Sequence, residues 1–129
     1  SGRFAAVVSS HGFLHGRRHA IEDRLRAVAA HLEDEGVLYA TFGSARDGRF
    51  GAGTRLDAAT YAPLEGDERG VAHTFFDRTA LDALLAPHFV TESAEERAVD
   101  EIAGSWAHRE GPLTGAVHWF VVARKPREE

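Results

Sequence analysis

Hydroxyl and imidazole side chains gather directly after the first apolar stretch of the chain. Ser9, Ser10, His11 and His15 follow the apolar residues 4–8. Imidazole titrates near neutral pH, so His11, and after it His15, is a candidate general base for an attacking hydroxyl or thiol. The alternative for His11 is that its ring hydrogen-bonds the backbone and closes the turn. This cluster is the first candidate for an active site.

A metal site is the second possible use of these side chains. His11, His15 and His19 are spaced by four residues, which on a helix would place three imidazoles on one face. Gly12 and Gly16 interrupt a helix here, and no neighbouring carboxylate completes a ligand set. The sequence therefore predicts no metal site, and a histidine metal-binding module is kept only as an alternative.

The elements that position this cluster begin with a strand, a helix and a second strand. Residues 3–10 form a continuous apolar run, typical of a strand that is buried on both faces of a parallel sheet. Apolar residues spaced by four, three and four then predict a helix that Gly36 ends, and residues 37–44 predict a second buried strand. Short joints make this a βαβ unit with parallel strands. The helical stripe is Ile21, Leu25, Val28 and Leu32.

The rest of the chain predicts a long loop, one helix and further strands. Residues 45–70 have few apolar side chains and many turn formers, which indicates either a functional loop or lid, or a surface excursion. Asp77 is placed to cap the next helix, and Pro87 to stop it. The last two strands lack a clear crossover helix and are expected to pair antiparallel. These later elements are expected at 71–76, 78–87, 88–100 and 116–125.

Ligands in open α/β sheets bind beyond the carboxyl ends of the strands, so further site residues are sought there. Phe42 and Ser44 close the second strand, and Tyr61 lies in the long loop. His73 stands where that loop returns to the sheet, as a substrate contact or a packed strand histidine. Trp106 lies in the last connection and is placed to cap the pocket. These residues and His15 are the predicted substrate contacts.

The ordered series resembles the C-terminal half of a class I S-adenosylmethionine-dependent methyltransferase. "RFAAVVSSHGFLHG" is similar to the fourth strand and its loop, and "LEDEGVLYATFGS" to the end of helix D and the fifth strand. "FGAGTRLDAATY", "GVAHTFFDRTALDALLAPHFV" and "GAVHWFVVARK" are similar to the following loop, helix E and the last two strands. The resemblance implies an α/β fold, half of a Rossmann-like sheet in the order 4-5-7-6 with the last strand antiparallel.

The same resemblance implies S-adenosyl-L-methionine as cofactor and a small molecule as methyl acceptor. It places Ser9, Ser10, His11 and Phe13 as cofactor contacts. Because the cofactor supplies the leaving group, the protein mainly positions the reactants.

The departure from the family lies in the cofactor-binding half. Gly48, Gly51 and Gly53 lie in the long loop and form no glycine-rich turn after a strand. Residues 1–129 are therefore expected to be a single partial domain without its N-terminal half, inactive alone and part of a longer parent. The bare edge of the first strand predicts self-association. The alternative is a non-enzymatic half-domain that pairs through this edge with a partner or a second copy.

Composition excludes several other classes. The formal net charge is -5 and the basic residues are scattered, which argues against nucleic acid as a partner. The absence of cysteine excludes disulfides, thiolate metal sites and cysteine nucleophiles. No apolar run is long enough to span a bilayer and no signal peptide is visible, so a cytoplasmic location without membrane contact is expected.

Overall fold

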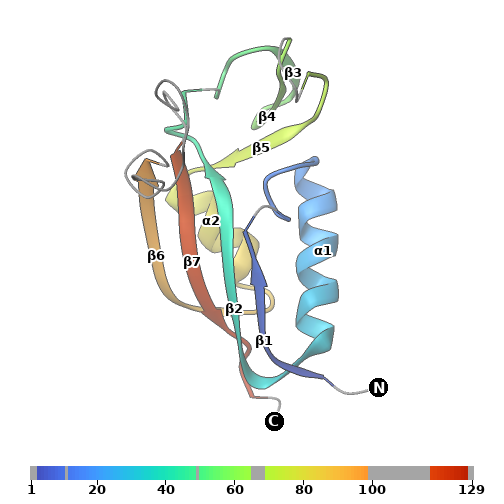
Figure 1. Ribbon diagram of the computed structural model, residues 1–129, viewed down its shortest axis with the longest axis vertical. Coiled ribbons are helices and arrows are strands. Elements are labelled where there is room, and N and C mark those ends of the chain that lie inside the picture. Colours follow the sequence, from blue (N-terminus) through green and yellow to red (C-terminus); the bar gives the residue numbers. More distant parts are fainter. Residues whose placement is uncertain (1–2, 11, 49, 65–68, 99–116, 128–129) are drawn as a thin grey trace, which may run out of the picture.

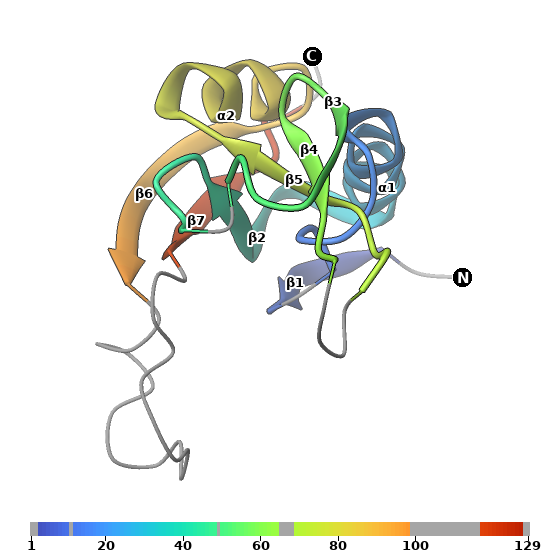
Figure 2. The ribbon, with the colours of Figure 1, turned by 90° about the horizontal axis from the view of Figure 1, so that it is seen from above.

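The computed structural model describes residues 3–10, 12–48, 50–64, 69–98 and 117–127. It is a mixed sheet with α1 and α2 packed against one of its faces (Figures 1 and 2). No helix in these ranges has the length and apolar character needed to cross a membrane. The elements in chain order are β1 (Phe4–Ser9), α1 (Arg18–His31), β2 (Leu32–Ser44), β3 (Thr54–Asp57), β4 (Thr60–Ala62), β5 (His73–Phe76), α2 (Arg78–Leu85), β6 (Val90–Ala98) and β7 (Val117–Arg124).

The main sheet has the predicted strand order. β1 pairs parallel with β2, with Val7 opposite Leu38, and α1 connects the two strands as expected for a βαβ unit. β7 lies between β2 and β6 and runs antiparallel to both. The order β1-β2-β7-β6 therefore confirms the predicted 4-5-7-6 half-sheet with its antiparallel last strand.

The segment 45–70 is more ordered than the sequence predicted. It contains β3 and β4, which form an antiparallel hairpin, and β4 pairs with β5. The Asp57 carboxylate accepts a hydrogen bond of 3.0 Å from the Ala59 N–H and closes the hairpin turn. The strands have four and three residues, too few for an alternating pattern to be recognised. β5 continues into the main sheet by pairing parallel with the end of β2.

The predicted role of Gly36 was wrong. α1 ends at His31, and Gly36 lies inside β2, which begins at Leu32. A Cβ at Gly36 would lie 2.7 Å from the Glu33 carbonyl oxygen and 3.2 Å from that of Ala5. The glycine is thus explained by close backbone packing between β1 and the start of β2, and not by a helix end.

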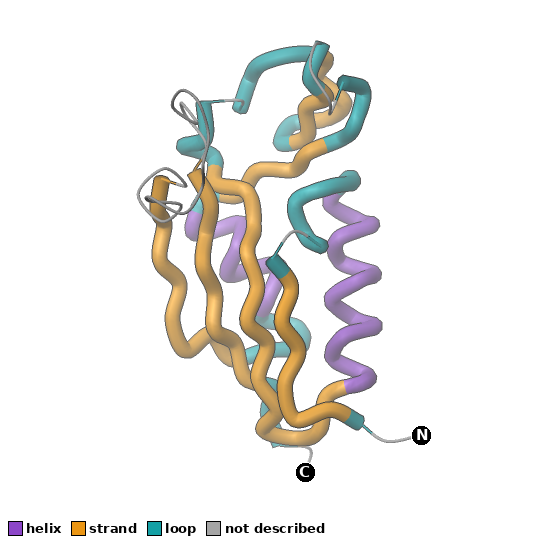
Figure 3. Tube along the Cα trace, in the orientation of Figure 1, coloured by secondary structure: helices purple, strands orange, loops and turns teal. Residues whose placement is uncertain are grey.

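The expectation that β1 is buried on both faces was also wrong. Val7 packs against the core, whereas the side chain of Val8 is 77% exposed and that of Phe4 is 58% exposed. The reason is that both described helices lie on the same face of the sheet. The other face, turned toward the viewer in Figure 3, is covered by no helix among the residues placed.

The core lies between the helices and the covered sheet face. Each helix contributes one apolar stripe, and α2 begins at Asp77, whose carboxylate accepts the predicted capping bond of 2.7 Å from the Ala80 N–H. Trp119 is buried as expected, and its indole N–H donates to the Phe76 carbonyl oxygen at 2.8 Å. The fully buried members include Ile21, Leu25, Leu38, Phe42, Phe76, Leu81 and Leu85.

Candidate functional site

The loop after β1 is joined to β5 at the carboxyl end of the parallel strands. The Gly16 N–H donates to the Ala72 carbonyl oxygen at 2.8 Å, and the Thr74 hydroxyl donates to the Gly16 carbonyl oxygen at 2.7 Å. The Thr74 hydroxyl also lies 2.8 Å from the hydroxyl of Thr60 on β4. These contacts join the loop after β1 to β5, and through Thr74 to Thr60 on β4 of the hairpin. The same end of the molecule is at the top of Figure 1.

Two predicted site histidines are brought together by this arrangement. The rings of His15 and His73 lie 4.7 Å apart, centroid to centroid, and are nearly perpendicular. His73 is buried, and its Nδ1–H donates to the Val71 carbonyl oxygen at 2.8 Å, which fixes the tautomer of the neutral ring. His15 is half-buried, and its carbonyl oxygen accepts a hydrogen bond from Arg24. His15 is therefore the imidazole that a small molecule could reach.

The two predicted serines lie beside a groove on the uncovered sheet face. Ser9 accepts a hydrogen bond of 3.1 Å from the Gly12 N–H, and the Thr41 hydroxyl donates to the Ser10 carbonyl oxygen. The groove has a volume of about 320 Å³ and a mostly apolar lining, to which serine and threonine residues also contribute. Its lining residues are Val8, Ser9, Ser10, Tyr39, Ala40, Thr41, Ser93, Phe120, Val121 and Val122.

This groove has the chemistry of a site for a flat, partly polar molecule. Tyr39 is 45% exposed, and its ring lies on the same face of the sheet as Val8 and Thr41, so the groove offers an aromatic surface with a hydroxyl group beside it. Sequence reasoning missed Tyr39, because its alternation with Leu38 and Ala40 is that of any half-buried strand.

Phe13 and Phe42, predicted cofactor and substrate contacts, pack in the core. Their rings stack at 5.2 Å with an interplanar angle of 15°, and their side chains are 3% and 0% exposed. Phe42 also meets Phe76 edge-on at 6.2 Å. In this structure the two rings attach the loop after β1 to the covered face of β2.

Ser44 and Tyr61 hold neighbouring elements together. The fully buried Ser44 hydroxyl donates to the carboxylate of Glu96 on β6, whose other oxygen lies 2.8 Å from the Arg46 guanidinium. Tyr61 packs on Phe50 at 5.4 Å between ring centroids. Glu96 lies 52 residues from Ser44 in the chain, so no local pattern could have indicated this pair.

The hairpin turn lies against the start of α1. The Arg17 guanidinium donates to the Leu56 carbonyl oxygen at 3.4 Å. Partial burial raises the pKa of Asp57, but hydrogen bonds from Ala59 and Thr60 and the charge of Arg17 outweigh this effect and hold the pKa below its ordinary value. The ionised carboxylate therefore helps to keep the hairpin beside the loop after β1.

Two predicted site residues, His11 and Trp106, lie outside the described residues. His19 is exposed on the first turn of α1. In the part of the chain that the structure describes, no three histidine or carboxylate side chains are grouped so that they could hold a metal ion.

No protein-family model and no curated protein sequence matches this chain. Solved structures do match its fold. A SAM-dependent methyltransferase from Methanosarcina mazei superposes with a TM-score of 0.70 at 14% identity, over 99% of this chain. The Burkholderia thailandensis 1,6-didemethyltoxoflavin-N1-methyltransferase, solved with 1,6-didemethyltoxoflavin and S-adenosylhomocysteine bound, gives 0.63 at 17% identity over 98%. The CcbJ methyltransferase of Streptomyces caelestis gives 0.57 at 12% over 96%.

The chain has a class I SAM methyltransferase-like fold. The resemblance inferred from the ordered sequence segments is thereby confirmed at the level of the fold. The matched part is 63% of the Methanosarcina chain, 45% of the Burkholderia chain and 61% of CcbJ. The chain thus spans about half to two thirds of the methyltransferases that it matches.

Proposed function

We propose that this chain forms the acceptor side of the active site of a SAM-dependent methyltransferase, and that the acceptor is a small molecule. The observation that carries the proposal is the fold, which follows three methyltransferases over at least 96% of this chain. The groove of about 320 Å³ supports a small ligand. Because the matched part is less than two thirds of each neighbour, we assign the activity to a longer protein that contains this chain.

The groove residues would bind and orient the cofactor. Ser10 and Thr41 offer hydroxyl groups, and Tyr39 offers an aromatic surface. When bound, S-adenosylmethionine supplies an activated methyl group. The protein's contribution is then to hold the acceptor close to that group and to exclude water, which lowers the entropic part of the barrier.

His15 is the group that would accept a proton from an acceptor hydroxyl or thiol. Its ring is partly exposed, and its backbone is held by the bridge to His73. The buried ring of His73 supports that of His15 from one side. A base in a fixed position contributes about 10²-fold or more to proton-transfer steps.

The test uses the product of the complete gene, a labelled methyl donor and a panel of small hydroxyl, thiol and amine acceptors. Transfer of label to a small acceptor is expected, and His15→Ala should lower kcat about 10²-fold for hydroxyl or thiol acceptors. Arg78→Gln, at an exposed position of α2, is the control and should leave kcat unchanged. Tight binding of S-adenosylhomocysteine without transfer to any small acceptor would contradict the proposed substrate class.

A second candidate function is a non-enzymatic half-domain that associates through β1. Among the residues that the structure describes, β1 pairs only with β2, and Val8 beside its free edge is 77% exposed. Edge strands of this kind pair readily with another chain. A concentration-dependent dimer that has no affinity for S-adenosylhomocysteine, measured by sedimentation and calorimetry, would favour this function over methyl transfer.

A further inference from the structure

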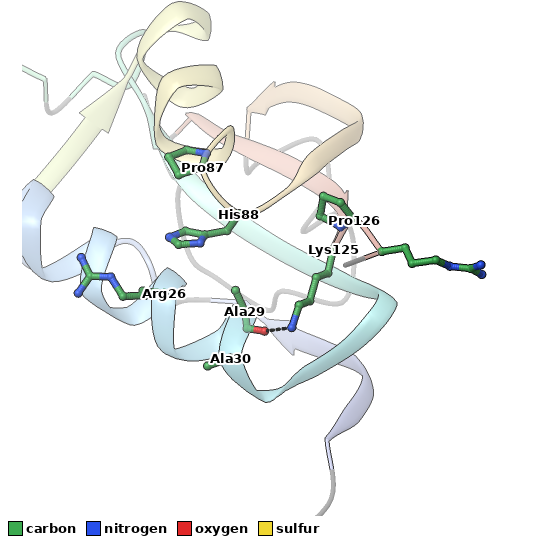
Figure 4. A pocket seen from close by; sticks show the side chains of 8 residues that line it. Arg26, Ala29, Ala30, Pro87, His88, Lys125 and Pro126 are labelled. Atoms are coloured by element: carbon green, nitrogen blue, oxygen red, sulfur yellow. Dashed lines mark hydrogen bonds between the residues drawn. The ribbon is translucent and has the colours of Figure 1, made fainter. Parts of the chain in front are cut away.

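A basic cavity lies at the end of the sheet opposite to the loop after β1. It lies where the end of α1, the turn after α2 and the residues after β7 meet, and its volume is about 390 Å³ (Figure 4). Its ionisable lining groups are Arg26, His88, Lys125 and Arg127. Among the residues that the structure describes, no acidic side chain lines it, although the chain as a whole carries a formal net charge of -5. The cavity is therefore a local positive region on an acidic protein.

Lys125, the single lysine of the chain, is the buried charge of this cavity. Its side chain is 9% exposed, and its ammonium donates to the carbonyl oxygens of Ala29 at 2.7 Å and Leu32 at 2.9 Å. These carbonyls lie at the end of α1, whose dipole offsets about half of a unit charge. An ammonium has three N–H donors, so one remains for a further acceptor. Among the described residues, no carboxylate forms an ion pair with Lys125.

Two further hydrogen-bond donors line the same cavity. His88 is half-buried, and its ring lies between Arg26 and Lys125 in the view of Figure 4. The Arg26 guanidinium pairs with Asp23 at 3.2 Å, and both side chains are more than 60% exposed. An exposed pair of this kind contributes about 1 kcal/mol or less, so Arg26 can turn toward an anion at little cost. Arg127, in contrast, is held by Glu35 at 2.8 Å.

Small and rigid side chains complete the lining of the cavity. Ala29 and Ala30 present small side chains, and Pro87 and Pro126 present rigid rings. None of these four side chains carries a charge, so the charge of the lining comes from its basic residues.

We propose that this cavity binds a phosphate group, with Lys125 as the fixed anchor and Arg26 and His88 as the groups that close on it. In Figure 4 the Arg26 guanidinium points away from Lys125, so it must turn to reach a ligand held by the ammonium. A phosphate supplies the negative charge and the several acceptor oxygens that these three donors require. The site lies away from the groove and from His15, and the inference does not depend on methyl transfer. The ligand is either inorganic phosphate or the phosphate of a small monoester.

The experiment is a titration of the chain with inorganic phosphate, and separately with glycerol phosphate, at constant ionic strength made up with chloride. Backbone amide NMR shifts at Ala29, Ala30 and His88 are expected to change saturably. Arg26→Gln should weaken binding about threefold to tenfold. Arg78→Gln removes a similarly exposed helical arginine elsewhere, whose partner is Asp82, and should change nothing.

The outcomes separate the proposal from a purely structural role of Lys125. Tighter binding of glycerol phosphate than of inorganic phosphate identifies a phosphorylated metabolite as the ligand, and equal binding identifies the free ion. The proposal would be overturned if the shifts rose linearly with phosphate, without saturation, and if chloride at the same concentrations caused equal shifts. It would also be overturned if Arg26→Gln and Arg78→Gln bound phosphate with equal affinity. His88→Gln gives an independent check that leaves the bonds of Lys125 to α1 intact, and unchanged affinity in that variant would also count against the site.

Discussion

The two faces of the sheet differ in what they contribute. The covered face carries Leu38, Ala40 and Phe42, all nearly inaccessible under the two helices. The other face carries Tyr39 and Thr41 from the same strand, and these line an open groove. One strand thus supplies core residues on one side and groove-lining residues on the other, because successive side chains point to opposite faces. Substitutions on the two faces should therefore have separable effects.

The largest effect on stability is expected from truncation on the covered face. Phe42→Ala removes a fully buried ring that contacts Phe13 and Phe76, and should lower the free energy of unfolding by about 3–5 kcal/mol. Urea denaturation measures this change. Tyr39→Ala, on the open face of the same strand, is the control and should cost about 1 kcal/mol or less. Equal losses for the two variants would show that the open face is covered in solution.

A smaller loss is expected at Trp119, again on the covered face. Trp119→Phe keeps much of the aromatic packing but removes the donor to the Phe76 carbonyl oxygen. A buried acceptor without its partner costs about 1–3 kcal/mol. Phe120→Leu, at the neighbouring position on the open face, serves as the comparison in the same urea series. The account would be weakened if Phe120→Leu were the more damaging change.

The covered face and its helices could be predicted from the sequence because their signals are local. Ile21 and Leu25 repeat at helical spacing, Asp77 stands directly before an apolar run, and the residues around Phe42 form a continuous apolar strand. The open face gave no such signal. The exposure of Val8 depends on where the second helix packs, which is decided by the whole topology and not by residues 3–10.

The position of the candidate site in the fold was predictable from the sequence, but the contacts of its residues were not. Ser9, Ser10 and His15 were chosen because polar residues after a buried strand indicate the carboxyl edge of a sheet, and in the structure they lie at or after the end of β1. The contact of His15 with His73 joins residues more than 50 positions apart in the chain, and that of Ser44 with Glu96 joins positions 52 residues apart. Long-range pairs of this kind leave no pattern in a single sequence.

A cap at the border of the covered face should have an intermediate effect. Asp77→Ala removes the bond to the Ala80 N–H and should cost about 1 kcal/mol, seen as a lower midpoint of thermal unfolding. Asp82→Ala in the same helix removes only an exposed pair with Arg78 and should cost less. If both variants unfold at the same temperature, the cap contributes nothing.

The smallest change in the free energy of unfolding is expected for a substitution on the open face. There the measurable effect should be on self-association. Val8→Lys should leave the free energy of unfolding within about 0.5 kcal/mol, because Val8 is 77% exposed. A charge beside the edge of β1 should abolish any self-association. Sedimentation of both proteins at high concentration measures this. A dimer that persists in the variant would place the contact elsewhere.

The hairpin beside the loop after β1 should respond to pH. The pKa of Asp57 is lower in the folded chain than its ordinary value of 3.8, so its ionised form stabilises the hairpin above that pH, and the contribution is lost as the pH falls through the folded pKa. NMR titration of the carboxyl carbon should give a midpoint below 3.8 in the native chain. Arg17→Gln should move the midpoint upward, whereas no movement would exclude Arg17 as a cause.

The most direct test of the central claim is to map S-adenosylhomocysteine on this chain by amide NMR at millimolar ligand. The account predicts weak, saturable shifts at Ser9, Ser10, Tyr39 and Thr41, on the open face at the carboxyl end of β1. Residues of the phosphate cavity and of the covered face should not respond. Shifts centred on the covered face or at the opposite end of the sheet would contradict the assignment of the open face to cofactor and acceptor, as would the absence of any localised shift.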